Sequence, residues 1–151
     1  MARRSTKRHA QLTPEDYAAL GAFRLALRRF LKFSEAAAHA GGLTAQQHQA
    51  LLAIRAHAGA EPMSIGELAT CLLIKNHSAV GLVARLQARG LVTRRASPDD
   101  RRRVQLALTS EADRVLEQIS RENIAELRDS AEAFDALLSA LQRIDGRGPA
   151  G

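Results

Sequence analysis

The sequence predicts a mainly α-helical fold that contains one small β-hairpin. Hydrophobic residues make up 46% of the chain, with much alanine and leucine and only 3% aromatic residues, a composition that favours helices. Between Ser64 and Thr109, the chain reads as a short helix, a tight turn, a longer helix and two short strand-like runs. This order predicts a winged helix-turn-helix, to which the remaining sequence adds helices at both ends.

The length of 151 residues suits a single domain, which we expect to span residues 12–145. Within it, residues of about 44–109 would form the winged helix, and residues of about 13–40 and 110–145 would form dimerisation helices. Residues 1–11 are polar and basic, which predicts a disordered tail. This tail is either a solvated segment or an arm that adds nonspecific phosphate contacts.

The first helix should begin at Pro14, with Thr13 as its cap, and end before the Gly41-Gly42 pair. An apolar stripe on a terminal helix usually packs within its own chain. Here the winged helix is too small to cover the stripe, so we expect a dimer interface instead. The stripe consists of Leu20, Phe23, Leu27, Phe30 and Leu31.

Two capping boxes open the next two helices, Thr44 with Gln47 and Ser64 with Glu67. In each box, the hydroxyl accepts from the backbone amide three residues on, and the side chain there returns a hydrogen bond to the cap. The helix that starts at Thr44 should end near Gly59 and support the helix-turn-helix. Its expected buried residues are Leu51, Leu52 and Ile54.

The longer helix should start near Lys75 or Asn76, with Asn76 as its candidate cap, and end at Gly90, where glycine tolerates positive φ. Its expected core stripe is Val80, Val83 and Leu86, with Ala79 and Leu82 beside it. The other side and the exposed first turn hold Lys75, Asn76, His77, Ser78, Gly81 and Arg85. A polar first turn alone would indicate only a surface helix with an ordinary solvated face.

The hairpin that follows favours an interaction with DNA. Its strands should lie at 91–95 and 104–108, the second with Val104, Leu106 and Leu108 inward and Gln105 and Ala107 outward. The connecting loop ends in Arg101, Arg102 and Arg103. Three consecutive arginines repel one another unless an anion compensates them, and the DNA backbone and its electronegative minor groove are such anions.

The positive charge is concentrated in this central region. The formal net charge is +6 overall. Residues 75–103 alone carry +6, with eight basic and two acidic residues, whereas residues 104–151 carry −4, with five basic and nine acidic residues. A generally basic protein would show no such separation.

After the hairpin, Thr109 is the expected cap of a long helix, and a last helix follows it. The last helix is apolar along one face and needs a partner, which the first helix and the terminal helices of a second subunit could supply. With the first helix, it gives the expected dimer interface: Leu20, Phe23, Leu27, Phe134, Leu137, Leu138, Leu141 and Ile144.

At the hairpin, Asp100-Arg101-Arg102, then Val104 and Leu108-Thr109, resembles the wing signature of the MarR family of bacterial transcription regulators. The upstream run HSAVGLVARLQARGLV is similar to that family's recognition helix, and the matching signature covers roughly residues 60–110. The resemblance implies that Asp100 braces the wing and that Arg102 enters the minor groove. The resemblance carries over no particular effector; by resemblance, such a ligand would often be an anionic aromatic compound lodged between the dimer helices and the DNA-reading domain.

These features predict a homodimeric, sequence-specific regulator of transcription, expected to be a repressor of a palindromic operator. Asn76, His77, Ser78 and Arg85 would read base edges, Gly81 would allow close approach, and Arg101 and Arg102 would reach the minor groove. The phosphate contacts would come from Lys75, Arg94, Arg95 and Arg103. The alternative is a sequence-tolerant architectural protein that binds DNA or RNA with the same basic face.

Other classes of function have little support. The sequence has no G-x-S-x-G motif and no P-loop, so we expect neither an enzyme nor a cofactor. His39, His48 and His57 are nine residues apart but span a Gly-Gly break, which argues against a metal site. Cys71 lies in an apolar run and should be a small buried hydrophobe rather than a redox sensor. No membrane span is expected, and the location should be the cytoplasm.

Overall fold

A computed structural model describes residues 11–59, 61–97 and 104–146 of the chain. The helices are α1 (Pro14–Ala40), α2 (Ala45–Ala56), α3 (Ile65–Cys71), α4 (Asn76–Ala88), α5 (Ser110–Asp129) and α6 (Ala131–Gly146). Between α4 and α5 lie the strands β1 (Val92–Ala96) and β2 (Val104–Leu108). Most of the predicted tail and the predicted hairpin tip, Asp100 to Arg103, lie outside the described residues.

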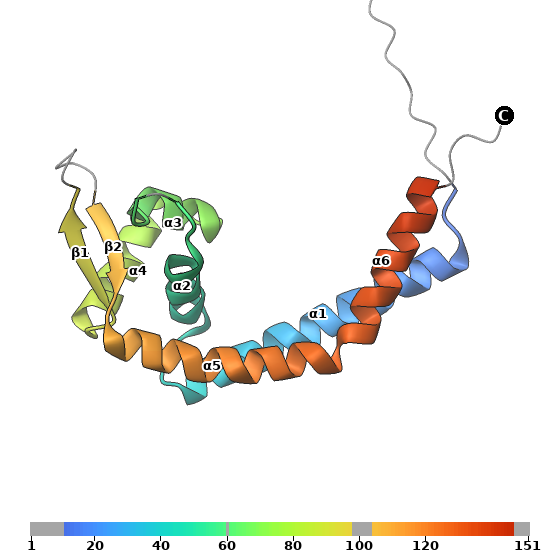
Figure 1. Cartoon of the computed structure of the whole chain (residues 1–151), viewed down its shortest axis with the longest axis horizontal. Helices are drawn as coiled ribbons and strands as arrows, with labels where there is room; N and C mark the ends of the chain where they lie inside the picture. The colour runs from blue at the N-terminus through green and yellow to red at the C-terminus, as the bar shows by residue number, and fades with distance from the viewer. Residues whose placement is uncertain (1–10, 60, 98–103, 147–151) are drawn as a thin grey trace, which may run out of the picture. The chain divides into compact units, whose positions relative to one another are not determined.

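The predicted fold class is confirmed, since the chain is mainly helical and carries one two-stranded antiparallel hairpin (Figure 1). The chain forms two compact units. Residues 33–123 form the winged-helix unit, and the end-helix unit comprises residues 1–32 and 124–151, of which 11–32 and 124–146 are described.

Local signals explain where the helices of the winged-helix unit begin and end. Both predicted capping boxes are present: Thr44 accepts from the amide of Gln47, and Ser64 accepts from that of Glu67, with each partner side chain returning to the cap. Gly42 and Gly90 have φ of 77° and 69°, so both turns use the left-handed backbone that glycine tolerates.

The core of the winged-helix unit lies among α2, α3, α4, the hairpin and the adjoining parts of α1 and α5. Its largest fully buried side chains come from six elements, which therefore share one core. They are Leu51, Leu68, Leu82, Val83, Leu86, Val92, Leu106 and Ile119. One predicted core residue of α2 is wrong, because Leu52 is exposed and Ala50 is buried instead.

The hairpin is extended by a third backbone contact. β1 pairs with β2 in the register Val92↔Leu108 to Ala96↔Val104. On its other edge, β2 meets the segment before α3, where Ser64 bridges to Gln105 and the Leu106 amide donates to the Met63 carbonyl at 2.8 Å. This contact fixes the base of the hairpin against the α2–α3 connection.

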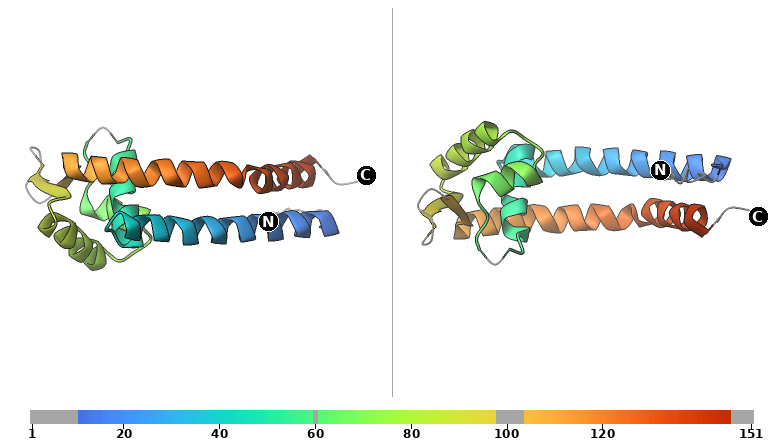
Figure 2. Two further views of the ribbon diagram at one scale, coloured as in Figure 1. Left: turned by 90° about the horizontal axis from the view of Figure 1, so that it is seen from below. Right: turned by 90° about the horizontal axis from the view of Figure 1, so that it is seen from above.

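In the end-helix unit, the first part of α1 lies alongside α6 (Figure 2). The rings of Phe23 and Phe134 meet edge to face, with centroids 5.5 Å apart. The Arg143 guanidinium lies 3.6 Å from the buried carboxylate of Asp16, whose other oxygen accepts from the Thr13 amide at 2.9 Å. In the described part of the chain, no helix is both long and apolar enough to cross a membrane.

A buried histidine in α2 should make folding sensitive to pH. Burial lowers the pKa of His48 below its ordinary value of 6.5, because the charged ring would lose its hydration. Its Nε2 is buried and has no hydrogen-bond partner among the described residues. Above the unfolded-state value the ring is neutral in both states, and below it only the unfolded state gains the proton.

We therefore expect the free energy of unfolding to decrease as the pH falls below about 6.5. Urea denaturation between pH 7.5 and pH 5.5 should show this decrease in the wild type and a smaller one in His48→Gln. The control is His39→Gln, which removes an exposed histidine from α1 and should keep the wild-type pH dependence. An unchanged pH dependence in His48→Gln would contradict the assignment.

Candidate nucleic-acid interface

The candidate interface centres on α4, whose two faces differ in chemistry. Ala79, Leu82, Val83 and Leu86 are buried and follow the i, i+3, i+4, i+7 spacing of one helix face. The start of the helix is polar and exposed, with Lys75, Asn76, His77 and Ser78 all open to solvent. The apolar face thus fixes the rotation of the helix, and the polar turn is presented outward.

Two details of α4 differ from the prediction. The N-cap is Lys75, whose side chain makes no capping hydrogen bond, and Asn76 is the first helical residue. Val80, predicted to be core, is 41% exposed because the buried stripe runs through Ala79 and Leu82. Without a capping role, the Asn76 amide can form hydrogen bonds with an outside partner.

The turn before α4 is unusual in its backbone. Leu73 has φ of 55°, a left-handed conformation that costs about 1 kcal/mol or more for a residue with a Cβ, and its side chain is 93% exposed. The amide of Ile74 donates to the carbonyl of Ala69 at 3.0 Å, which closes the end of α3. This closed turn sets the direction in which α4 leaves α3.

Gly81 and Arg85 lie together on α4. A Cβ at Gly81 would stand 3.5 Å from an Nη atom of Arg85, an ordinary van der Waals distance. Packing within the chain therefore does not require glycine at this position. The role of Gly81 in a close approach to DNA therefore stays a prediction.

The two arginines of β1 have different surroundings. Arg94 donates through Nη2 to the carbonyl of Val80 at 3.3 Å and is half-buried, whereas Arg95 is exposed. The Nε of Arg94 is buried and has no partner among the described residues. Arg94 thus connects the hairpin to the middle of α4, a role that the sequence pattern did not reveal. Asp100, Arg101, Arg102 and Arg103 lie outside the described residues.

The hairpin has a further side-chain attachment at Gln105. Its predicted outward position is wrong, because Gln105 is only 8% exposed and its Nε2 donates to Glu61 Oε2 at 2.9 Å. The alternating sequence pattern of β2 did not predict this burial, because the segment before α3 covers that edge of the strand. A signal for this existed in Pro62-Met63, a short extended stretch directly before the capping box.

Two further candidates from the sequence, Cys71 and a metal site, can be compared with the structure. Cys71, predicted to be buried, is exposed at the end of α3, because its apolar neighbours do not cover it. Among the described residues, no three His, Cys, Asp or Glu side chains are grouped so that they could hold a metal ion. The polar turn of α4 and the β1 arginines therefore remain the surface with the clearest chemistry.

Comparisons with known proteins agree with this architecture. The sequence profile of the MarR family matches residues 41–103, which include α2 to α4 and β1. No curated protein matches the chain significantly.

The solved structures that are similar to the chain include a MarR family transcription regulator, SP03579, with 25% identity and a TM-score of 0.67, over 85% of this chain and 84% of that one. The transcriptional repressor CouR, in a structure bound to a 23-mer DNA duplex, has 28% identity and a TM-score of 0.65, over 90% and 99%. The regulator Tm0710 from Thermotoga maritima shares the fold, with 24% identity and a TM-score of 0.64, over 86% and 93%.

The neighbouring arginines of β1 provide a matched test of the attachment between hairpin and α4. Arg94→Met keeps the aliphatic stem but loses the hydrogen bond to the Val80 carbonyl, so it should lower the free energy of unfolding by about 1.5 kcal/mol. Arg95→Met should change it by less than about 0.5 kcal/mol, because that side chain is exposed. Urea denaturation measures both, and equal stabilities would show that Arg94 does not hold the hairpin.

Proposed function

We propose that this chain is a DNA-binding transcription regulator of the MarR family and that it acts as a homodimeric repressor of a palindromic operator. The proposal rests above all on the exposed polar turn at Lys75–Ser78 above the buried apolar face of α4. CouR, whose structure contains a DNA duplex, is a repressor of the same fold. A role on the chromosome implies the cytoplasm as its location.

In the proposed complex, the first turn of α4 enters the major groove. Asn76, His77 and Ser78 project hydrogen-bonding groups from this turn, and asparagine can pair with adenine through two hydrogen bonds. Arg85 lies farther along, beside Gly81, where the backbone can approach the duplex. A good bidentate contact would contribute about 1–3 kcal/mol of discrimination between bases.

Phosphate contacts would position the module without reading sequence. Lys75 and Arg95 are exposed at the N-terminus of α4 and on β1, and each would add one charge that salt screens. The Nη1 of Arg94 could reach a phosphate while Nη2 holds the Val80 carbonyl. By the family resemblance, Arg102 would enter the minor groove and Asp100 would brace the wing. Arg101 and Arg103 flank Arg102 in the sequence.

The end-helix unit offers apolar surface for a second subunit. Leu138 and Leu141 of α6 are 56% and 50% exposed, and Leu20 of α1 is exposed as well. Large exposed aliphatic side chains at helical spacing are costly in water, which favours their burial against a partner. Phe23 and Phe134 contact each other within the chain and would support this surface. Leu27 and Leu137 are half-buried, and the side chain of Ile144 lies outside the described residues.

The two-fold arrangement would account both for operator binding by the dimer and for its release from the operator by a ligand. Two reading helices would contact half-sites about one helical turn, ~34 Å, apart. A small molecule that binds better to a dimer with another spacing would lower the affinity for the operator, because linkage requires only a difference in affinity between the two states.

A competition experiment separates this function from sequence-tolerant binding. A palindromic duplex chosen by selection competes with random DNA for the full chain across a series of salt concentrations. A specific regulator should prefer the palindrome by about 10³-fold or more. Equal competition together with a steep salt dependence would indicate an architectural protein instead.

Substitutions at two adjacent residues should distinguish contacts with the phosphate backbone from contacts with the bases. Lys75→Ala should weaken binding to all duplexes alike and reduce the salt dependence of log K by about one charge. Asn76→Ala should weaken the preferred duplex most and relax the base preference at one position of each half-site, at about 1–3 kcal/mol. Fluorescence anisotropy with a set of single-base variants measures both effects. A uniform loss in Asn76→Ala would remove that residue from base reading.

The proposed dimer surface can be tested on exposed positions of α6. Leu138→Glu with Leu141→Glu should give a folded monomer that binds the operator weakly, because charged carboxylates would be buried in the interface. Ser139→Glu with Gln142→Glu adds the same charges at exposed positions of α6 and should remain dimeric. Light scattering gives the mass and circular dichroism the helicity. A leucine double variant that stays dimeric would show that the interface lies elsewhere.

A further inference from the structure

We propose that Val80 of α4 contacts the C5-methyl group of a thymine in each half-site of the operator and so takes part in base reading. The side chain of Val80, predicted to lie in the core, is exposed. This contact depends on the proposed function, since it concerns the face of α4 that is proposed to enter the major groove.

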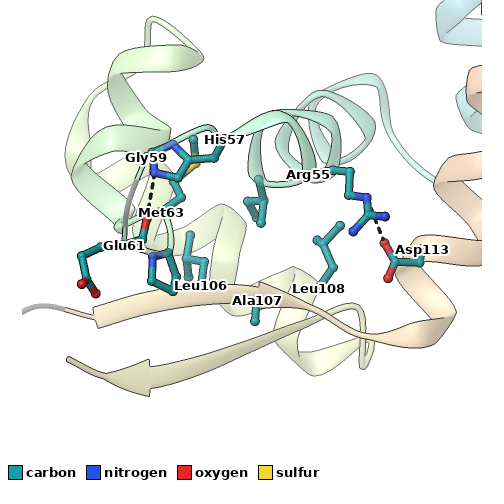
Figure 3. A pocket seen from close by; sticks show the side chains of 11 residues that line it. Arg55, His57, Gly59, Glu61, Met63, Leu106, Ala107, Leu108 and Asp113 are labelled. Atoms are coloured by element: carbon teal, nitrogen blue, oxygen red, sulfur yellow. Dashed lines mark hydrogen bonds and ion pairs between the residues drawn. The ribbon is translucent and has the colours of Figure 1, made fainter. Parts of the chain in front are cut away.

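Val80 is one of three large aliphatic side chains that are exposed in the described part of the winged-helix unit. The other two, Leu52 and Leu73, border a common cleft between α2 and the turn after α3. Val80 borders neither this cleft nor two others that α2 lines, one of which Figure 3 shows between α2 and β2. A ligand in these clefts would therefore leave Val80 uncovered, and its partner must approach α4 from outside.

Val80 lies in the same row of α4 as Asn76. Residues four positions apart share one face of a helix, and Asn76, Val80 and Ala84 are all exposed. Ala84 has no side-chain atom beyond Cβ, so it leaves the Val80 methyl groups accessible. The buried Leu82 and Leu86 fix the rotation of the helix. A helix that presents Asn76 to the major groove therefore presents Val80 to it as well.

The Val80 methyl groups are held in place before DNA is bound. The carbonyl of Val80 accepts a hydrogen bond from Arg94 Nη2 at 3.3 Å, which connects this turn of α4 to β1. Valine is branched at Cβ, and one χ1 rotamer is strongly preferred in a helix. A contact made by such a side chain loses little conformational entropy when the complex forms.

Thymine is the base whose major-groove edge suits this side chain. Among the four bases of DNA, it alone carries a methyl group on that edge, and apolar side chains recognise it by direct contact. Such a contact removes apolar surface from water. Beside another base, valine would displace water from polar groups to which it can give no hydrogen bond. Val80 therefore favours a thymine at the position that it covers.

The spacing along the helix places this thymine. Four residues of an α-helix rise by about 6 Å, whereas successive bases of one strand are separated by about 3.4 Å along the duplex. The thymine contacted by Val80 should therefore lie within about two base pairs of the base contacted by Asn76. Single-base variants of the operator, measured with Asn76→Ala, locate that base.

Replacement of thymine by uracil tests the contact, because uracil pairs with adenine in the same way and lacks only the C5-methyl group. The duplex selected from a random pool is synthesised with deoxyuridine in place of each thymidine in turn, in both half-sites together. Fluorescence anisotropy with the full chain measures the affinity. At one position near the Asn76 base, the wild type should bind about tenfold more weakly, because each half-site loses a buried methyl group.

The matching protein variant is Val80→Ala, which keeps the helix because alanine has the highest helix propensity. It should bind the thymine-containing operator about tenfold more weakly than the wild type. At the position in question, uracil should then cause no further loss. Leu52→Ala is the control, since it shortens an exposed aliphatic side chain on α2 and should retain the wild-type affinity and the wild-type response to uracil.

The assignment is overturned if no thymine shows a uracil effect that disappears in Val80→Ala. This result would leave the proposed function standing, because the operator would still be bound in preference to random DNA. A selection that enriches no duplex would contradict the proposed function, and base reading by Val80 with it.

Discussion

The burial of four side chains on one face of α4 determines how this protein can contact DNA. Ala79, Leu82, Val83 and Leu86 lie in the core of the winged-helix unit, and burying a leucine contributes about 1.5–3 kcal/mol. Rotating the helix by a single residue, about 100°, would expose part of this stripe and bury polar groups without partners. The core therefore sets the direction of Lys75 to Ser78 without any of these residues taking part in it.

The hairpin depends on the same core but is held by polar contacts. Arg94 connects β1 to the Val80 carbonyl, while Glu61 and the Met63 carbonyl hold Gln105 and Leu106 of β2. These hydrogen bonds are few and partly exposed, and each contributes about 1 kcal/mol to the free energy of unfolding. The orientation of α4 therefore depends on hydrophobic burial, whereas the placement of the hairpin depends largely on hydrogen bonds.

The sequence predicted the elements better than their exposure. Capping boxes, Gly42, Gly90 and the capping Thr109 act within a few residues, so the element order and most boundaries could be read directly. Exposure depends on distant neighbours. Leu52, Val80 and Cys71 are exposed because nothing in their own unit covers them, and Gln105 is buried because the segment before α3 does. The hydrogen bond from Arg94 to Val80 joins residues 14 positions apart, beyond the range of any local pattern. The assignment of individual residues to DNA contacts remains a prediction, since exposure shows that a side chain is accessible to DNA and not that it contacts DNA.

The central claim is that two copies of this chain present their α4 helices to one duplex. Selection of bound duplexes from a random pool, with the full-length chain at physiological salt, tests it most directly. The account predicts enrichment of an inverted repeat whose half-sites have centres about 10 base pairs, or ~34 Å, apart, the separation of two major-groove segments on one face of the duplex. A single unrepeated motif, or a pool without any enriched sequence, would contradict it.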